Sequence, residues 1–251
     1  MSRPRVLVTR DAGGCSRWSA RLAELGAEPV SLPCLEHAVM PESELELRRA
    51  LTTARWLVVT SARGVDAVAE LLGGSGPVRT GELLPPGVSV AAVGPTTASQ
   101  ALRVLGRVDL VPPTPNASTL AEALWSTADA DLGPVVVATA DRGRRDLQTI
   151  LSPRGVDVRR VAVYRTLPAA ASARRRALAT DRLDAVLLAS PSALEGLLAQ
   201  VEVPADLPIV TLGPTTSSAV RDAGLRVAAE AQQPSLDALY EAFRGLPAVA
   251  S

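Results

Sequence analysis

The sequence predicts an α/β protein with parallel sheets, on the strength of its apolar strand-like runs, the helical stretches between them and its scarcity of aromatic residues. Of the 251 residues, 47% are hydrophobic and only 2% are aromatic. The core must therefore consist of Val, Leu, Ile and Ala, which suits parallel sheets covered by helices. The length allows one large domain or two of ordinary size.

The expected strands lack the alternation of polar and apolar residues that marks a half-exposed strand. Strands buried on both faces of a parallel sheet have this continuous apolar character. Because stretches with helical spacing follow them, the connections should be parallel crossovers in a doubly wound sheet. The runs are residues 6–8, 56–59, 90–93, 135–138, 185–188 and 209–212.

An internal repeat indicates that this arrangement occurs twice. Residues 88–126 match 207–243, and both contain Gly-Pro-Thr-Thr between a strand and a helix. Upstream, 56–72 match 185–201, and 5–38 match 135–166. About five strands in each half predict two flavodoxin-like domains with parallel sheets.

Two extended segments, 28–40 and 156–168, occupy equivalent places in the repeat and are longer than an average strand of about 5–6 residues. Each could run out of one domain into the other. The repeat allows two domains in series, or a chain that crosses twice so that residues 1–35 join the C-terminal part. The repeat alone leaves both arrangements open.

Composition excludes several classes of function. A formal net charge of zero argues against a nucleic-acid partner, which would need a strongly basic surface. No stretch approaches the length of a membrane span, no signal peptide is recognised, and Cys15 and Cys34 lack metal or disulfide spacing. We therefore expect a cytoplasmic protein.

The residues that are missing also restrict the chemistry. The chain has no lysine, which excludes a Schiff base and a P-loop lysine, and a single histidine, His37. A two-histidine metal site is impossible, and no nucleophile elbow accompanies His37, which we interpret as structural or solvent-facing. An enzyme of this composition would work mainly by binding and positioning.

The candidate binding residues lie where strands end and helices begin, at the carboxyl edge of each predicted sheet, where ligands of open α/β sheets bind. Ser, Thr and Pro in these loops suit helix N-termini, and capping alone would explain each loop taken singly. Several helix N-termini together would present free N–H groups to an acid with many negative charges. The candidates are Thr9, Arg10, Thr60, Ser61, Arg63, Gly94, Thr96, Thr97, Arg142, Arg144, Ser190, Ser192, Gly213, Thr215 and Thr216.

Arginines in or beside these loops could add bidentate contacts to carboxylates, although each could equally be a solvated surface charge. Tyr164 lies in the second extended segment, and its phenol could donate a hydrogen bond or a proton near neutral pH. The alternative for Tyr164 is an aromatic side chain whose hydroxyl only reaches water. Asn116 or Ser118 is the expected cap of a further helix.

The ordered set of motifs resembles the uroporphyrinogen-III synthase family. The residues that carry the resemblance are VLVTR at the start, VVTSARGVDAV, AAVGPTTASQALRVLG, VAVYRT, LLASPSALEGLL and VTLGPTTSSAVRDAGL followed by PSLDALYEAF. These motifs span essentially the whole chain in the right order. Each is weak alone, and GPTT before a helix of small residues is the sharpest.

The resemblance implies two domains joined by a two-stranded linker, with the chain crossing twice. One domain would hold 1–35 and 168–251, the other 41–160, and the linker strands would be 36–40 and 161–167. It also implies cofactor-free closure of hydroxymethylbilane, an open tetrapyrrole with eight carboxylates, with loss of water and inversion of ring D through a spiro intermediate. The product would be uroporphyrinogen III.

By the same resemblance, Tyr164 would protonate the departing hydroxyl, and the hydroxyl residues above would line the cleft. The chain has Thr139-Ala140 where relatives often have Arg-Gly, so a contact from that position is in doubt. The expected partner is the small-molecule substrate alone, with no nucleic acid and no membrane. We expect a monomer, with a transient hand-over of substrate from the preceding enzyme of the pathway.

Two other functions remain open at this point. A non-catalytic two-domain protein could bind or sense an anionic small molecule with the same loops. A nucleotide-dependent enzyme is the less favoured alternative, because no G-x-G-x-x-G follows the first strand.

Overall fold

The chain folds into two compact units, each built on its own sheet. The structure, a computed structural model, describes residues 3–73, 83–127, 132–171, 176–177 and 183–247. Unit 1 comprises Met1–Glu36 and Leu167–Ser251, and unit 2 comprises His37–Thr166. The chain therefore enters unit 2 once and returns once, at His37 and after Thr166.

The sheet of unit 1 is parallel throughout and has flavodoxin-like strand order. β1 lies between β2 and β9, and β11 lies between β9 and β12. Counted along the chain, this is the order 2-1-3-4-5. The strands are β1 (Arg5–Val8), β2 (Glu28–Ser31), β9 (Ala185–Leu188), β11 (Ile209–Thr211) and β12 (Val227–Glu230).

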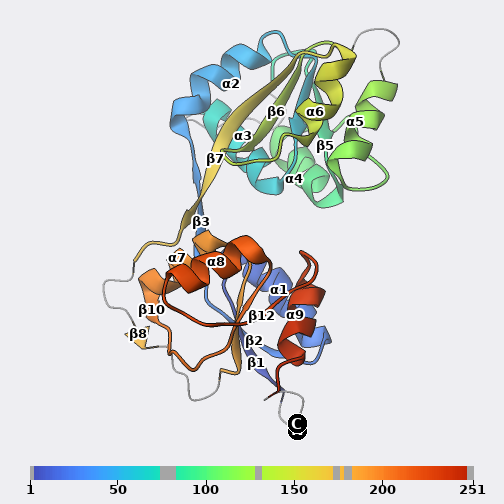
Figure 1. Cartoon of the computed structure of the whole chain (residues 1–251). Helices are drawn as coiled ribbons and strands as arrows, with labels where there is room; N and C mark the ends of the chain where they lie inside the picture. Colours follow the sequence, from blue (N-terminus) through green and yellow to red (C-terminus); the bar gives the residue numbers. More distant parts are fainter. Residues whose placement is uncertain (1–2, 74–82, 128–131, 172–175, 178–182, 248–251) are drawn as a thin grey trace. The chain divides into compact units, whose positions relative to one another are not determined.

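Two helices cover each face of this sheet (Figure 1). One layer contains α1 (Ala12–Glu24) and α9 (Leu236–Arg244), and the other contains α7 (Pro191–Gln200) and α8 (Pro214–Asp222). Phe243 of α9 is fully buried in the first layer. Two short strands, β8 (Arg176–Ala177) and β10 (Val201–Glu202), pair in a separate ladder.

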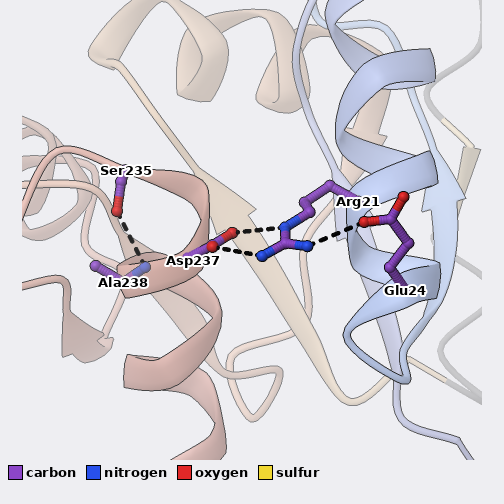
Figure 2. A network of polar contacts seen from close by, with 5 residues as sticks. All are labelled: Arg21, Glu24, Ser235, Asp237 and Ala238. Atoms are coloured by element: carbon purple, nitrogen blue, oxygen red, sulfur yellow. Dashed lines mark hydrogen bonds and ion pairs between the residues drawn. The ribbon is translucent and has the colours of Figure 1, made fainter.

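The first and last helices of unit 1 are linked by a charged pair (Figure 2). Arg21 of α1 forms a fork with Asp237 of α9, with nitrogen–oxygen distances of 3.0 and 2.7 Å, and also reaches Glu24. The Arg21 guanidinium lowers the pKa of the Asp237 carboxyl. This contact joins residues 216 positions apart, so it helps to close unit 1 across the inserted unit 2.

The sheet of unit 2 has the order β3-β7-β6-β4-β5, and the pairs β7–β6, β6–β4 and β4–β5 are parallel. Leu110 forms an isolated parallel bridge to Ala91, beside β5. The strands are β3 (Leu35–Val39), β4 (Trp56–Val59), β5 (Ser89–Ala92), β6 (Val135–Ala140) and β7 (Val158–Pro168).

Helices cover both faces of this sheet as well (Figure 1). Along β4, Leu57 and Val59 pack into one layer and Val58 into the other, all with no exposed surface. Burial on both faces explains why the strand runs do not alternate. The first layer contains α2 (Glu44–Leu51), α3 (Ala62–Gly73) and α4 (Pro95–Leu105), and the second contains α5 (Ala117–Ser126) and α6 (Asp146–Leu151). The short helix η1 (Pro41–Ser43) precedes α2, and η2 (Ser152–Arg154) follows α6.

The repeat found in the sequence corresponds to equivalent strands in equivalent places. β6 and β7 match β1 and β2, while β4 and β5 match β9 and β11. The four equivalent strands therefore have the same spatial order in both sheets, although the chain begins unit 1 with the pair that ends unit 2. The fifth strand differs, because β12 lies beside β11 in unit 1 whereas β3 lies beside β7 in unit 2. The predicted fold class, α/β with flavodoxin-like parallel sheets, is confirmed.

The two extended segments differ from each other. The second segment, 156–168, contains one strand of 11 residues, β7, which begins at Val158. The first segment, 28–40, instead forms β2 and β3 with a break at Leu32–Cys34. Pro33 lies in the break and has no N–H to donate to a ladder. The chain passes from unit 1 to unit 2 within β3 and back within β7.

Among the helices that the structure describes, none combines the length and the apolar character that a membrane span requires.

Candidate functional site

Unit 2 contains a cavity of about 560 Å³ at the carboxyl edge of its sheet. Thr60 and Ser61 follow β4, Val93 follows β5, and strands β6 and β7 contribute residues of their own. The first turns of α5 and α6 complete the wall. This is where the topology of a parallel sheet places ligands. The lining residues are Thr60, Ser61, Val93, Pro115, Asn116, Ala117, Ser118, Val137, Thr139, Ala140, Gly143, Arg144, Asp146, Leu147 and Tyr164.

Tyr164 and Ser61 form a hydroxyl pair in this wall. Their oxygen atoms lie 3.1 Å apart, although the two residues are 103 positions apart in the chain. The Ser61 hydroxyl also accepts the N–H of Gly64, in the first turn of α3, at 3.0 Å. Since this bond and the positive end of the helix both draw electron density from Ser61, its hydroxyl is polarised toward donating to the phenol oxygen.

When Ser61 donates in this way, the phenol proton of Tyr164 is left to face a group in the cavity. A serine donor would also stabilise the phenolate that remains after proton transfer. The hydroxyl pair therefore has the arrangement of an acid with its own stabilising donor. Either oxygen could be the donor by geometry alone, so the direction rests on the helix end.

His37 lies against the other side of Tyr164. The ring centroids are 5.8 Å apart and the planes meet at 78°, an edge-to-face contact. The His37 Nδ1 lies 3.1 Å from the hydroxyl oxygen of Thr166. The prediction of His37 as a structural residue did not include this contact with the candidate acid.

The loop after β6 supplies the only arginine among the cavity-lining residues, Arg144. Gly143 allows the loop to fold back, because a Cβ there would lie 2.0 Å from the Thr139 Oγ1. The Arg160 side chain of β7 donates to the Gly143 carbonyl at 2.7 Å, and the Asp141 N–H donates to the Tyr164 carbonyl at 2.9 Å. The neighbouring strand thus fixes the loop that carries Arg144.

The first turn of α5 presents backbone donors to the same cavity. Asn116 is its cap and accepts the Thr119 N–H at 2.9 Å, which resolves the choice between Asn116 and Ser118. The N–H groups of Ala117 and Ser118 belong to the first helical turn, which has no partner inside the helix. Together with Arg144, they make this wall suitable for an anionic group.

Four predicted site residues line this cavity: Thr60, Ser61, Arg144 and Tyr164. The other candidates in unit 2 lie outside its lining, and Thr97 among them is buried. Gly94 caps α4 and lies against Pro115, since a Cβ on Gly94 would come within 2.7 Å of the Pro115 Cβ. Those outside the lining are Arg63, Gly94, Thr96, Thr97 and Arg142.

The remaining predicted residues belong to unit 1 and mostly serve its local structure. The Thr9 hydroxyl is buried and donates to the Leu187 carbonyl at 2.8 Å, and Arg10 stacks over Trp18. Ser190 caps α7. The others are Ser192 in the first turn of α7 and Gly213, Thr215 and Thr216 at the start of α8.

Comparison with known proteins then identifies the family. The model of a family described as uroporphyrinogen-III synthase HemD matches residues 16–241. The chain belongs to the uroporphyrinogen-III synthase family. The resemblance seen in the ordered motifs is therefore confirmed.

Curated proteins support this assignment to the uroporphyrinogen-III synthase family. The porphyrin biosynthesis protein HemD of Ruminiclostridium josui is 25% identical over 94% of this chain and 47% of its own length. The uroporphyrinogen-III synthase of Synechococcus elongatus is 32% identical over 47% of this chain and 44% of its own length. The chain spans about half the length of these curated relatives at most.

Solved structures share the fold. The uroporphyrinogen-III synthetase of Helicobacter pylori superposes with a TM-score of 0.54 at 19% identity, covering 95% of this chain and 97% of the other. A mutant uroporphyrinogen III synthase of Thermus thermophilus gives a TM-score of 0.50 at 17% identity, covering 96% and 97%. At sequence identities this low, the similarity shows that the fold is shared and does not by itself indicate function.

Sequence reasoning missed part of the cavity. Thr139 lies near the end of β6, Gly143 and Asp146 follow that strand, and Ala117 begins α5. These places at strand and helix ends could have marked them as lining residues. His37 and Arg160 had no such signal. Their roles depend on which strands become neighbours, and the sequence left that open.

Proposed function

We propose that this chain catalyses the closure of hydroxymethylbilane to uroporphyrinogen III, with loss of water and inversion of ring D. The observation that carries the proposal is the Tyr164–Ser61 hydroxyl pair in the wall of the unit 2 cavity, in a member of this family. The proposal includes the role of Tyr164 as the acid.

The first step is departure of the hydroxyl group. Tyr164 gives its proton to the leaving hydroxyl, which departs as water, while the electrons of the pyrrole nitrogen form the new double bond. Ser61 stabilises the phenolate by donating to its oxygen. The substrate supplies the electron push, so the protein needs neither lysine nor a second histidine.

The second step is attack by the substituted carbon of ring D on the new electrophile, which gives the spiro intermediate. The bond between that ring carbon and the methylene that joined it to ring C then breaks. This methylene bonds to the other α carbon of ring D, so that ring D is inverted. Loss of a ring proton restores the aromatic pyrrole, and the Tyr164 phenolate is placed to accept that proton. One water is lost overall, and the tyrosine returns to its starting form.

Substrate carboxylates would be held by the α5 first turn and Arg144 at the cavity wall. The predicted residues that do not line the cavity remain proposed substrate contacts. Folding of the flexible bilane is then chiefly a matter of orientation, a contribution that reaches about 7–11 kcal/mol at best. We further propose a cytoplasmic monomer that uses no cofactor and receives substrate by transient hand-over from the preceding enzyme.

The deciding experiment supplies hydroxymethylbilane, oxidises the products and separates the porphyrin isomers by chromatography. Spontaneous closure gives the symmetric type I isomer. A dominant type III product is the expected result. Type I alone, formed at the rate seen without protein, would refute the proposal and favour a protein that binds or senses an anionic small molecule.

A further inference from the structure

The environment of Tyr164 includes a residue that the proposed chemistry does not use. His37 is the only histidine in the chain, and its ring meets the Tyr164 ring edge to face at a centroid distance of 5.8 Å. His37 lies on β3 and Tyr164 on β7, and these strands are neighbours in the sheet of unit 2. The contact therefore exists only when both strands are in place.

His37 is itself held from a second direction. Its Nδ1 lies 3.1 Å from the Thr166 Oγ1. Thr166 follows Tyr164 by two residues, and such residues share one face of a strand. The Thr166 hydroxyl thus fixes the imidazole beside the phenol ring, and all three side chains are partly buried.

Tyr164 is consequently held at both ends of its side chain. Ser61 meets the hydroxyl at 3.1 Å, while His37 meets the ring. An edge-to-face contact favours one orientation because the positive edge of one ring meets the negative face of the other. A phenol with only the Ser61 contact could tilt about its Cα–Cβ bond and still satisfy a hydrogen bond to water.

We propose that His37 is a positioning residue that fixes the Tyr164 ring, so that the phenol hydroxyl stays beside Ser61 and faces the cavity. This inference rests on the proposed function, because Tyr164 is the acid in that proposal. His37 acts through Tyr164 and needs no contact with substrate. Its loss should therefore lower turnover and leave substrate binding intact.

A loosened Tyr164 should also change the product. If protonation of the leaving group is not coordinated with folding of the bilane, more of the reactive substrate closes without ring inversion. The fraction of type I isomer is then expected to rise. This gives a second readout from the same assay.

The test compares three variants with the wild-type chain: His37→Ala, His37→Phe and Thr166→Val. From the strength of an edge-to-face aromatic pair, His37→Ala should lower kcat about two- to tenfold with KM unchanged. His37→Phe keeps a ring edge and should retain most of the wild-type kcat. The kcat of Thr166→Val should lie between those of His37→Ala and His37→Phe. A control, Trp125→Ala at the C-terminal end of α5, should leave kcat and the isomer ratio unchanged.

A spectroscopic measurement tests the positioning independently of activity. The chain has two tyrosines, Tyr164 and Tyr240, so ring-¹³C-tyrosine labelling with a Tyr240→Phe reference assigns both signals. His37→Ala should shift and broaden the Tyr164 signal, and His37→Phe should leave it sharp. If His37→Ala fails to fold, the kcat values of His37→Phe and Thr166→Val decide the question. The positioning role predicts a lower kcat for Thr166→Val than for His37→Phe, and the reverse order would overturn it.

An unchanged Tyr164 signal in His37→Ala would overturn the positioning role, and so would equal losses of kcat in His37→Phe and His37→Ala. If wild-type protein yields only type I isomer at the uncatalysed rate, the proposed function fails instead. The tyrosine spectrum would still show whether His37 sets the geometry of Tyr164, so the two failures are distinguishable.

Discussion

The four equivalent strands have the same order in both units, but the units differ at one position at the carboxyl edge of the sheet. In unit 2, Tyr164 pairs in register with Ala140 and lines the cavity. In unit 1, Val8 pairs with Ser31 as Ala138 pairs with Val161 in unit 2, so the register places Cys34 at the position equivalent to Tyr164, where its N–H donates to the Arg10 carbonyl at 2.9 Å. Cys34 is fully buried. The equivalent position therefore carries a cavity-lining phenol in unit 2 and a buried thiol, in the break after β2, in unit 1.

The equivalent hydroxyl residues of the two units also differ in whether they line the cavity. Ser61 and Ser190 occupy equivalent positions and both cap a helix, with hydrogen bonds of 3.0 and 3.2 Å. Thr9 and its equivalent Thr139 are both buried, but Thr139 also contributes to the cavity wall. What both units keep is therefore a requirement of the fold, and what unit 2 alone adds marks the candidate chemistry.

The largest effect is expected from Tyr164→Phe. In the proposed mechanism the phenol supplies the acid, and general acids contribute about a hundredfold or more, so kcat should fall by at least that factor with a smaller change in KM. Steady-state kinetics with isomer analysis measures both. Cys34→Ala is the matched change in unit 1 and should lower stability without lowering kcat. Unchanged turnover in Tyr164→Phe would remove this residue from the mechanism.

The next effect concerns helix packing, which is tighter in unit 1 than at the equivalent position of unit 2. Gly196 of α7 lies so close to the β2–β3 break that a Cβ would come within 1.9 Å of the Cys34 carbonyl oxygen. Its equivalent in unit 2 is Ala67, which is buried without difficulty. Gly196→Ala should lower the free energy of unfolding by about 1–3 kcal/mol, measured by urea denaturation.

Ala67→Gly serves as the reverse change. It should cost only about 1 kcal/mol, the helix propensity of glycine relative to alanine. Equal losses from the two substitutions would show that the close approach of α7 to Cys34 does not distinguish the units.

The equivalent serines Ser61 and Ser190 test whether the loss of a helix cap affects stability alone or also catalysis. Ser61→Ala and Ser190→Ala should each destabilise the fold by about 1 kcal/mol, because each removes an N-cap. Only Ser61→Ala should also lower kcat, by about tenfold, since it removes the donor to the phenolate. Ser190→Ala is expected to affect KM at most. A kcat loss of the same size in both variants would contradict the division between the units.

The smallest effect is a pH dependence of unit 1 that arises from Cys34. Burial, and to a lesser degree the nearby Cys15, raise the pKa of the Cys34 thiol from 9.0 to about 12. The unfolded thiol ionises above pH 9 and the folded one does not, so the stabilisation is complete below pH 9 and is lost as pH rises toward 12. Between pH 8 and pH 10, wild type should lose about 1 kcal/mol more stability than Cys34→Ala. Urea unfolding at the two pH values measures the difference, and parallel losses would contradict it.

The sequence was sufficient for the fold class because the same physical constraint acts on every strand. Leu57, Val58 and Val59 are all fully buried, so their run shows no alternation, and the repeat supplies the number of such runs. Gly-Pro-Thr-Thr predicted the start of α4 and of α8, where proline occupies the first helical turn. Local rules were enough for these elements.

The candidate cavity was only partly predictable, because its wall depends on distant pairing. Thr60, Ser61 and Arg144 follow strands and were recognisable by that position. The contact of His37 with Tyr164 requires β3 to lie beside β7, and the contact of Arg160 with Gly143 requires a particular fold of the loop after β6. Neither contact can be deduced from the residues adjacent in the sequence.

The double crossing of the chain has a consequence for how the protein is made. β1 pairs with β2 early, but its other neighbour, β9, begins about 180 residues later, at Ala185. At roughly 5–20 residues per second, the ribosome needs on the order of 10–40 seconds to synthesise that interval. Unit 2, a continuous stretch from His37 to Thr166, can fold first. During that time the apolar edge of β1 is exposed in the nascent chain, so unit 1 is the part that most needs protection from aggregation in the cell.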